Sequence, residues 1–177
     1  MKIDTLILSV TDDCNLACRY CFVQHKPEYM TLDIAKRSID YFIQINADND
    51  KELTVLFFGG EPTLQWDTII VPIVDYCKNF DRKIKFGITT NGTLLNTDRL
   101  RYMKENNFNM LLSFDGNKKT QNFNRPYKDG SGSFDKVIEN LPDILNFYPD
   151  VTARGTIYPE TAKYLIDNIM FFNSLGI

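Results

Sequence analysis

The chain has 177 residues, of which 24% are charged and 44% are hydrophobic, and its formal net charge is −3. This length suffices for one domain with a sizeable core, and the composition is ordinary for a globular protein. The sequence has no block of Lys or Arg, so we expect no nucleic-acid partner. Its apolar runs are too short to span a bilayer and its N-terminus lacks a cleavage site for a signal peptide. We therefore expect a cytoplasmic protein without a membrane partner.

Apolar runs rich in β-branched residues alternate with helical patterns along the chain. Strands are predicted at 4–10, 52–58, 83–90, 108–114 and 150–158. Helices are predicted at 31–45, 66–80, 96–107, 134–148 and 160–176, the second of them carrying Pro72 in its first half.

The predicted helix ends have recognisable capping residues. Thr31 precedes an apolar stripe and is the expected N-cap of the first helix, and Asn96 or Thr97 is the expected cap of the third. Gly176 is the expected C-cap of the last helix. Pro142 is expected to interrupt or kink the helix that contains it.

Five successive strand–helix units predict a parallel sheet with right-handed crossovers, either a barrel or a doubly wound sheet. A complete barrel usually needs about 200 residues or more, and this chain stops where a sixth strand should begin. We therefore expect an α/β fold in the form of a partial (β/α) TIM-like barrel, with five of about six units present. The segment 128–133 (KDGSGS) is expected to be a flexible loop tip.

Three of the four cysteines stand close together, at Cys14, Cys18 and Cys21. Disulfides are rare in a reducing compartment, so this group is expected to bind metal or do redox chemistry. One reading is an iron–sulfur cluster whose fourth iron has no protein ligand, which would leave a coordination site open for chemistry. The other reading is a structural zinc site of the Cys3His type, with His25 as the fourth ligand.

The remaining cysteine, Cys77, lies among Ile73, Val74 and Phe80 on a predicted helix. A free cysteine in such surroundings behaves as a small hydrophobic residue. We expect it to be a buried core thiol that takes no part in the metal site.

The predicted strands end in polar turns, and the carboxyl ends of parallel strands meet at one edge of a sheet, where α/β proteins bind ligands. Glu61, after the glycine pair Gly59–Gly60, offers a carboxylate suited to an ammonium group, and the absence of side chains before it would let a ligand approach the backbone. Asn91 could offer its amide to the same ligand. Ser113 and Arg125 could bind a carboxylate or ribose hydroxyls.

These residues together resemble the radical S-adenosylmethionine (SAM) superfamily. The spacing Cys14-x3-Cys18-x2-Cys21, with Tyr20 before the third cysteine, resembles the cluster motif of that family, and the stretch 59–62 (GGEP) resembles its GGE motif. The stretch 113–134 (SFDGNKKTQNFNRPYKDGSGSF) is similar to a segment of anaerobic sulfatase maturases and peptide-modifying maturases.

The resemblance implies that the three cysteines hold a [4Fe-4S] cluster and that SAM chelates the fourth iron. Positions that contact SAM in the family correspond to Tyr20, Gly60, Ser113 and Arg125, and Glu61 would meet the methionyl ammonium. Reduction of the cluster by an external donor of the flavodoxin or ferredoxin type would cleave SAM to a 5′-deoxyadenosyl radical, which takes hydrogen from the substrate. The cofactors would carry this chemistry, and the protein would supply position and exclusion of water.

The resemblance also implies the substrate class, a peptide or protein side chain, with thioether crosslinking of ribosomally made peptides as one example. Sulfatase maturation and radical chemistry on a small molecule are the alternatives. Members of the subgroup continue into a cysteine-rich region with auxiliary clusters, called SPASM or Twitch. We therefore expect residues 1–177 to be an incomplete radical SAM core. Asp115 is expected to shape a turn and not to act as a base.

Overall fold

The structure is a computed structural model that describes residues 3–48 and 51–177. Its five strands form one parallel sheet in which the spatial order follows the sequence. The strands are β1 (Thr5–Thr11), β2 (Leu53–Gly59), β3 (Ile84–Thr90), β4 (Phe108–Ser113) and β5 (Thr152–Arg154). The predicted α/β class and the parallel order of the strands are confirmed.

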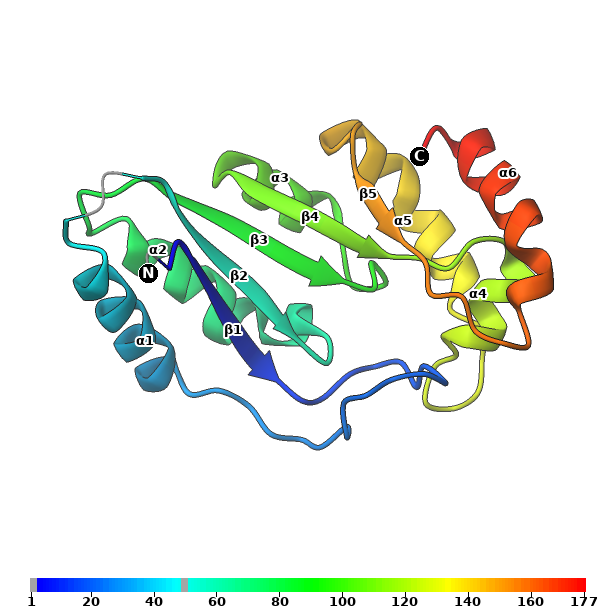
Figure 1. Cartoon of the computed structure of the whole chain (residues 1–177), viewed down its shortest axis with the longest axis horizontal. Helices are drawn as coiled ribbons and strands as arrows, with labels where there is room; N and C mark the ends of the chain where they lie inside the picture. Colours follow the sequence, from blue (N-terminus) through cyan, green and yellow to red (C-terminus); the bar gives the residue numbers. More distant parts are fainter. Residues whose placement is uncertain (1–2, 49–50) are drawn as a thin grey trace.

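The α-helices are α1 (Leu32–Ile45), α2 (Val71–Cys77), α3 (Thr97–Glu105), α4 (Lys118–Asn124), α5 (Phe134–Phe147) and α6 (Leu165–Leu175). Helices α1, α2, α3 and α5 lie along one side of the sheet, whereas α4 and α6 lie beyond the carboxyl end of the strands (Figure 1). Two 3-10 turns (Pro62–Gln65 and Ala162–Tyr164) and one π-helical turn (Trp66–Ile70) complete the helical elements of the described chain.

The core lies between this side of the sheet and the helices. Alternate strand residues such as Leu8, Val55, Phe57 and Ile88 are buried there, as the period of two in a strand requires. Side chains on the other face stay accessible, and Ile7 on β1 is 58% exposed. The uncovered face and the strand ends next to it therefore remain available for a site.

The helix caps agree with the sequence. Thr31 accepts a hydrogen bond from the Ile34 N–H, and Asn96 accepts one from the Arg99 N–H. Gly176 caps α6 with a φ of 77°, a left-handed conformation that glycine adopts without steric cost.

Two predicted elements are shorter than the pattern indicated. The fifth strand covers 152–154 and not 150–158, because it pairs only with the end of β4 and has no second neighbour among the described strands. The predicted helix 66–80 divides at Ile70 into a π-helical turn and α2. Pro72 then lies in the first turn of α2, directly after the π-helical turn.

Helix α5 runs continuously from 134 to 147, so Pro142 does not interrupt it. Helix α4 was not predicted, because its sequence KKTQNFN has no apolar stripe. The segment 128–133 lies in a largely exposed turn, as a loop tip should, and the Tyr127 N–H donates to the Ser131 carbonyl across it at 2.8 Å.

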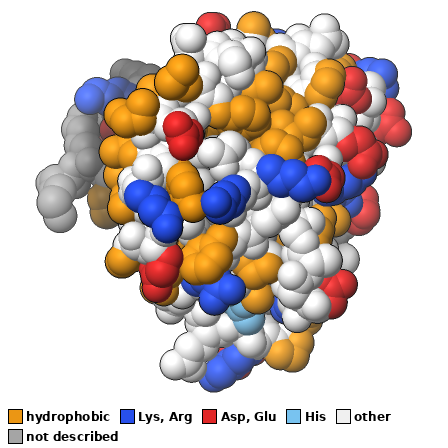
Figure 2. Space-filling view, turned by 90° about the vertical axis from the view of Figure 1, so that its right-hand side faces the viewer, with side chains coloured by type: hydrophobic (Ala, Val, Ile, Leu, Met, Phe, Trp, Pro, Cys, Tyr) orange, Lys and Arg blue, Asp and Glu red, His pale blue; other side chains and the backbone are white. Residues whose placement is uncertain are grey.

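Helix α6 exposes apolar side chains on its outer side. Leu165, Ile166, Ile169 and Met170 are between 40% and 66% exposed. Figure 2 faces this end of the molecule and shows apolar side chains gathered in its upper part, where α6 lies. Among the helices that the structure describes, none has the length and hydropathy needed to cross a membrane.

Candidate cofactor site

The cysteine loop that follows β1 is fastened at both ends. At its base, an antiparallel bridge joins Thr11 to Tyr29. At its far end, the loop pairs with the last residue of α4 and with the segment that follows it. There the Ala17 N–H donates to the Pro126 carbonyl at 2.8 Å, and the Arg19 N–H donates to the Asn124 carbonyl at 2.9 Å. The chain after α4 therefore acts as a partner strand that fixes the loop.

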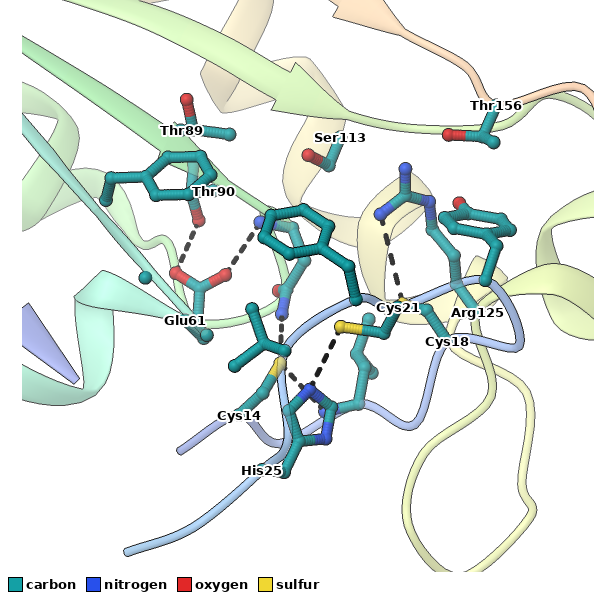
Figure 3. A pocket seen from close by; sticks show the side chains of 18 of the residues that line it. Cys14, Cys18, Cys21, His25, Glu61, Thr89, Thr90, Ser113, Arg125 and Thr156 are labelled. Carbon is teal, nitrogen blue, oxygen red and sulfur yellow. Dashed lines mark hydrogen bonds between the residues drawn. The ribbon is translucent and has the colours of Figure 1, made fainter. Parts of the chain in front are cut away.

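The three clustered cysteines line one cavity of about 370 Å³ at the carboxyl end of the sheet (Figure 3). Cys14 is buried, Cys18 is partly buried and Cys21 is exposed. Burial raises the pKa of the Cys14 thiol to about 12 and also raises the pKa of Cys18. Both thiols are therefore protonated at neutral pH in the metal-free protein. Cys77 is buried in the core, as predicted.

His25 lines the same cavity, and its Nε2 lies 3.3 Å from Cys21 Sγ. Within residues 3–48 and 51–177, however, no three His, Cys, Asp or Glu side chains converge closely enough to hold a single metal ion. The Cys3His zinc site that the spacing allowed is therefore not preformed. A four-iron cluster places each cysteine on a different iron, so three thiols around a cavity fit that donor set.

Gly59 and Gly60 allow the end of β2 to lie against the cysteine loop. The Gly60 N–H donates to the Thr11 carbonyl at 2.7 Å, and the Glu61 N–H donates to the Asp13 carbonyl at 2.9 Å. A Cβ at Gly60 would collide with the Asp13 carbonyl, and one at Gly59 would collide with the Thr11 carbonyl. The backbone of the cysteine loop therefore excludes a side chain at both positions.

Glu61 places a carboxylate at the wall of the cavity and is only 1% exposed. It accepts hydrogen bonds from the backbone N–H and hydroxyl of Thr63, from the Thr90 hydroxyl and from the Asn91 N–H. Burial raises its pKa, and these hydrogen bonds offset part of the effect. In the described chain no cationic side chain forms an ion pair with it. An ammonium group from a ligand would supply the missing counter-charge.

Asn91 joins the end of β3 to the cysteine loop. Its Nδ2 donates to Asn15 Oδ1 at 2.8 Å and lies 3.9 Å from Cys14 Sγ, while its Oδ1 accepts from the N–H and hydroxyl of Thr93. Ser113 ends β4, and its hydroxyl makes no hydrogen bond within the described residues. Ser113 is therefore the freer of the two to bind a ligand.

Arg125 and Tyr20 meet at Asp115. Arg125 Nε donates to Asp115 Oδ1 at 2.8 Å, and the Tyr20 hydroxyl donates to Asp115 Oδ2 at 2.6 Å. Asp115 also accepts from the Asn124 amide and the Thr156 N–H, so four donors surround it. The carboxylate is thus occupied by the protein, which agrees with a turn-shaping role and leaves it no free position to act as a base.

Several cavity residues lie outside the predicted set of site residues. Thr89, Thr90, Arg154 and Thr156 belong to the strand-end turns that were expected at this edge of the sheet, whereas Leu16, Phe22, Val23 and Phe58 carried no such signal. The alternation of side chains along each strand was a usable signal. Thr89 is registered with Leu111, and Ser113, two residues further along β4, is registered with Arg154, so Thr89, Ser113 and Arg154 lie on the same face of the sheet. Arg154 is exposed and forms no ion pair within the described residues.

A parallel sheet with three cysteines and a buried, unpaired carboxylate at its strand ends defines a cofactor-binding α/β domain. Residues 8–172 match the family model described as the radical SAM superfamily. The chain therefore belongs to this superfamily, whose members bind a [4Fe-4S] cluster and SAM. The resemblance inferred from the motifs and the cofactors it implied are confirmed at the level of the family.

Two relatives and one solved structure show which members of the superfamily this chain is similar to. The radical SAM cyclopropyl synthase TigE of Paramaledivibacter caminithermalis is 30% identical, over 97% of this chain and 39% of the relative. A cysteine-type anaerobic sulfatase-maturating enzyme of Clostridium novyi is 32% identical, over 97% of this chain and 48% of the relative. The structure of native anSMEcpe with bound AdoMet and Cp18Cys peptide matches with a TM-score of 0.79 and 25% identity, over 96% of this chain and 47% of that one. The chain thus spans less than half the length of each.

Proposed function

We propose that this chain is the catalytic core of a radical SAM maturase that acts on a peptide or protein side chain. The observation that carries the proposal is the single cavity that Cys14, Cys18 and Cys21 share with Glu61 and Arg125. Thiol, carboxylate and guanidinium groups around one space are the donor set that a cluster and a zwitterionic amino-acid group require.

In this proposal the three cysteines hold the cluster, and Glu61 faces the methionyl ammonium of SAM. Ser113 offers its free hydroxyl to the methionyl carboxylate. Arg125 uses Nε for Asp115 and directs Nη1 toward Cys18 Sγ, and its remaining N–H groups bind the same carboxylate with a charge-assisted hydrogen bond. Tyr20 lies beside this group, with the Arg125 guanidinium 5.3 Å from its ring.

Gly59, Gly60 and Asn91 fix the position of the cysteine loop in this proposal. The glycines hold the cysteine loop against β2, and Asn91 connects β3 to the same loop through Asn15. When bound, the cofactors supply reductive cleavage of SAM and hydrogen abstraction from the substrate. The chain's own residues orient the amino-acid end of SAM and exclude water from it, which is the usual division of work in cofactor enzymes.

The substrate class rests on the relatives and on the exposed part of the cavity. A peptide accompanies AdoMet in the anSMEcpe structure, and two relatives are named for a sulfatase maturation and a cyclopropyl synthesis. In this chain Phe22 and Arg154 are exposed on the cavity wall, where an apolar group and an anionic group of a peptide would find contacts. Thioether crosslinking is one reaction of this class, and sulfatase maturation is another.

The test is anaerobic reconstitution of the full-length protein with iron and sulfide, followed by reduction with SAM present. We expect about four irons per core cluster site, and 5′-deoxyadenosine formation that depends on an added electron donor of the flavodoxin or ferredoxin type or on dithionite. The triple variant Cys14→Ala, Cys18→Ala, Cys21→Ala should yield no 5′-deoxyadenosine, whereas Cys77→Ala should behave as the parent.

Substrate class is then tested with peptides from short reading frames encoded beside the gene. Mass loss or crosslinking in a cysteine-containing peptide would support a peptide maturase, whereas oxidation of a sulfatase active-site peptide would favour the sulfatase reaction. Zinc without iron in the anaerobically purified protein would refute the proposal.

A further inference from the structure

Each of the three cysteine sulfurs has a nitrogen within hydrogen-bonding reach, and each nitrogen comes from a different part of the chain. The contacts are Leu16 N to Cys14 Sγ at 3.4 Å, Arg125 Nη1 to Cys18 Sγ at 3.9 Å and His25 Nε2 to Cys21 Sγ at 3.3 Å. The Leu16 group belongs to the backbone, and Arg125 is fixed by its ion pair with Asp115. Asn91 Nδ2 also lies 3.9 Å from Cys14 Sγ, and it is held by its hydrogen bond to Asn15. His25 is the side-chain donor of this set that makes no other hydrogen bond within the described residues.

The position of His25 follows from the return of the cysteine loop to the sheet. After Cys21 the chain runs back to Glu28, whose carbonyl accepts from the Asp12 N–H at 3.1 Å and from the Thr11 hydroxyl at 2.8 Å. The bridge between Thr11 and Tyr29 closes the loop directly afterwards. His25 is therefore held between a metal-ligand position and an anchored end, and Figure 3 shows its ring turned toward the Cys21 sulfur.

The direction of this hydrogen bond follows from the chemistry of a bound thiolate. A cysteine that ligates iron carries no proton, so its sulfur can only accept. His25 must then carry its proton on Nε2 and donate it toward Cys21.

We propose that His25 is a positioning residue that donates a hydrogen bond to the Cys21 thiolate of the cluster and so raises the reduction potential of the cluster. The inference rests on the proposed cluster at these cysteines. Hydrogen bonds to the sulfurs are one of the factors that set the potential of iron–sulfur clusters. Reduction adds negative charge to the cluster, so an N–H aimed at a sulfur stabilises the reduced form more than the oxidised form. His25 thereby makes the cluster easier to reduce.

The experiment compares His25→Leu, which removes the donor, with His25→Gln, which keeps an N–H on a side chain of similar reach. Gln24→Leu serves as the matched control, because Gln24 is exposed on the same loop and does not line the cavity. Each full-length protein is reconstituted anaerobically, its iron and sulfide are measured, and the cluster is titrated reductively without SAM while EPR follows the reduced form.

At the potential where half of the parent cluster is reduced, we expect the ratio of reduced to oxidised cluster to fall about tenfold in His25→Leu, equivalent to about 59 mV for a one-electron couple. His25→Gln should fall between this variant and the parent, and Gln24→Leu should match the parent. Equal potentials in all four proteins would overturn the inference and leave the proposed function intact.

Two other outcomes would also overturn the inference. Loss of iron in His25→Leu would mean that His25 is itself a metal ligand, which overturns the role of donor. Failure of the parent to take up any iron–sulfur cluster would overturn the proposed function, and the inference with it. Because the iron content is measured before the potential, these outcomes are distinguished from an unchanged potential in loaded proteins.

Discussion

Asp115 and Arg125 form a buried ion pair, with Arg125 Nε 2.8 Å from Asp115 Oδ1 and both side chains less than 10% exposed. The pair joins the end of β4 to the residue that follows α4. Through Asp115 Oδ2 it also reaches Tyr20 in the cysteine loop. Three segments far apart in the sequence therefore depend on one carboxylate for their relative positions.

Asp115→Asn should destabilise the protein strongly. The amide would place an N–H where Oδ2 now accepts from Tyr20 and Asn124, and the Arg125 charge would lose its counter-ion. Breaking a buried pair from one side typically costs about 3–5 kcal/mol. Asp135→Asn is the control, because its exposed pair with Lys118 contributes at most about 1 kcal/mol. Urea unfolding of the two variants measures the difference, and equal losses would contradict the network.

Gly60→Ala should displace the cysteine loop. The added Cβ would collide with the Asp13 carbonyl, a backbone atom that cannot turn away as a flexible side chain would. We expect lower iron incorporation in Gly60→Ala after reconstitution. Gly155→Ala is the control, since a Cβ there meets its nearest atom at 3.4 Å, an ordinary contact, and should leave the iron content unchanged. Normal iron in Gly60→Ala would mean that the loop adjusts without cost.

Much of the fold was predictable because local patterns determine it. The strand runs, the caps at Thr31 and Asn96 and the C-cap at Gly176 depend on neighbours within a few residues. Helix α4 and the short β5 were not predictable in the same way. The sequence of α4 lacks an apolar stripe, and the length of β5 depends on how far β4 extends beside it.

The cysteine motif and the GGEP turn of the site could be recognised from spacing, but their supporting contacts could not. Tyr20 meets Asp115 across 95 residues, and Asn15 meets Asn91 across 76. Such pairs are set by tertiary packing and leave no local signal. The glycine pair illustrates the limit: its place at the end of β2 could be read from the sequence, but its close packing against the backbone of the cysteine loop could not.

Glu61→Gln should weaken SAM binding while the cluster remains. The amide keeps the size of the side chain but removes the charge that would face the methionyl ammonium. Losing a charge-assisted hydrogen bond of about 1.5–3 kcal/mol corresponds to roughly ten- to a hundredfold in affinity. Glu61→Ala is a poorer probe, because it also leaves the Asn91 N–H and Thr90 hydroxyl without their acceptor. Titration of the reconstituted protein with SAM gives the affinity, and exposed Glu52→Gln is the control.

The pH dependence of the metal-free protein tests the burial of Glu61 separately. Burial raises the pKa of its carboxyl above the ordinary 4.5, so the folded state binds this proton more tightly than the unfolded state. Its contribution to the free energy of unfolding is therefore complete below the ordinary pKa and is lost as pH rises through the raised value. Within that window the parent should lose up to about 1.4 kcal/mol per pH unit relative to Glu61→Gln. Parallel curves for the two proteins would mean that the carboxyl is ionised without cost.

The four cysteines should divide into two kinds when each is replaced by alanine. Cys14, Cys18 and Cys21 line the cavity, so each single replacement should abolish a stable cluster, because one missing ligand leaves a second iron without protein coordination. Cys77 lies in the core at 4% exposure and does not line the cavity, so its replacement should keep the full iron content and lower stability by roughly 0.5–3 kcal/mol, as core truncations usually do. Iron analysis and urea unfolding of the same four proteins give both quantities. A cluster retained with only two of the three cavity cysteines, or one lost with Cys77, would refute the assignment of the ligands.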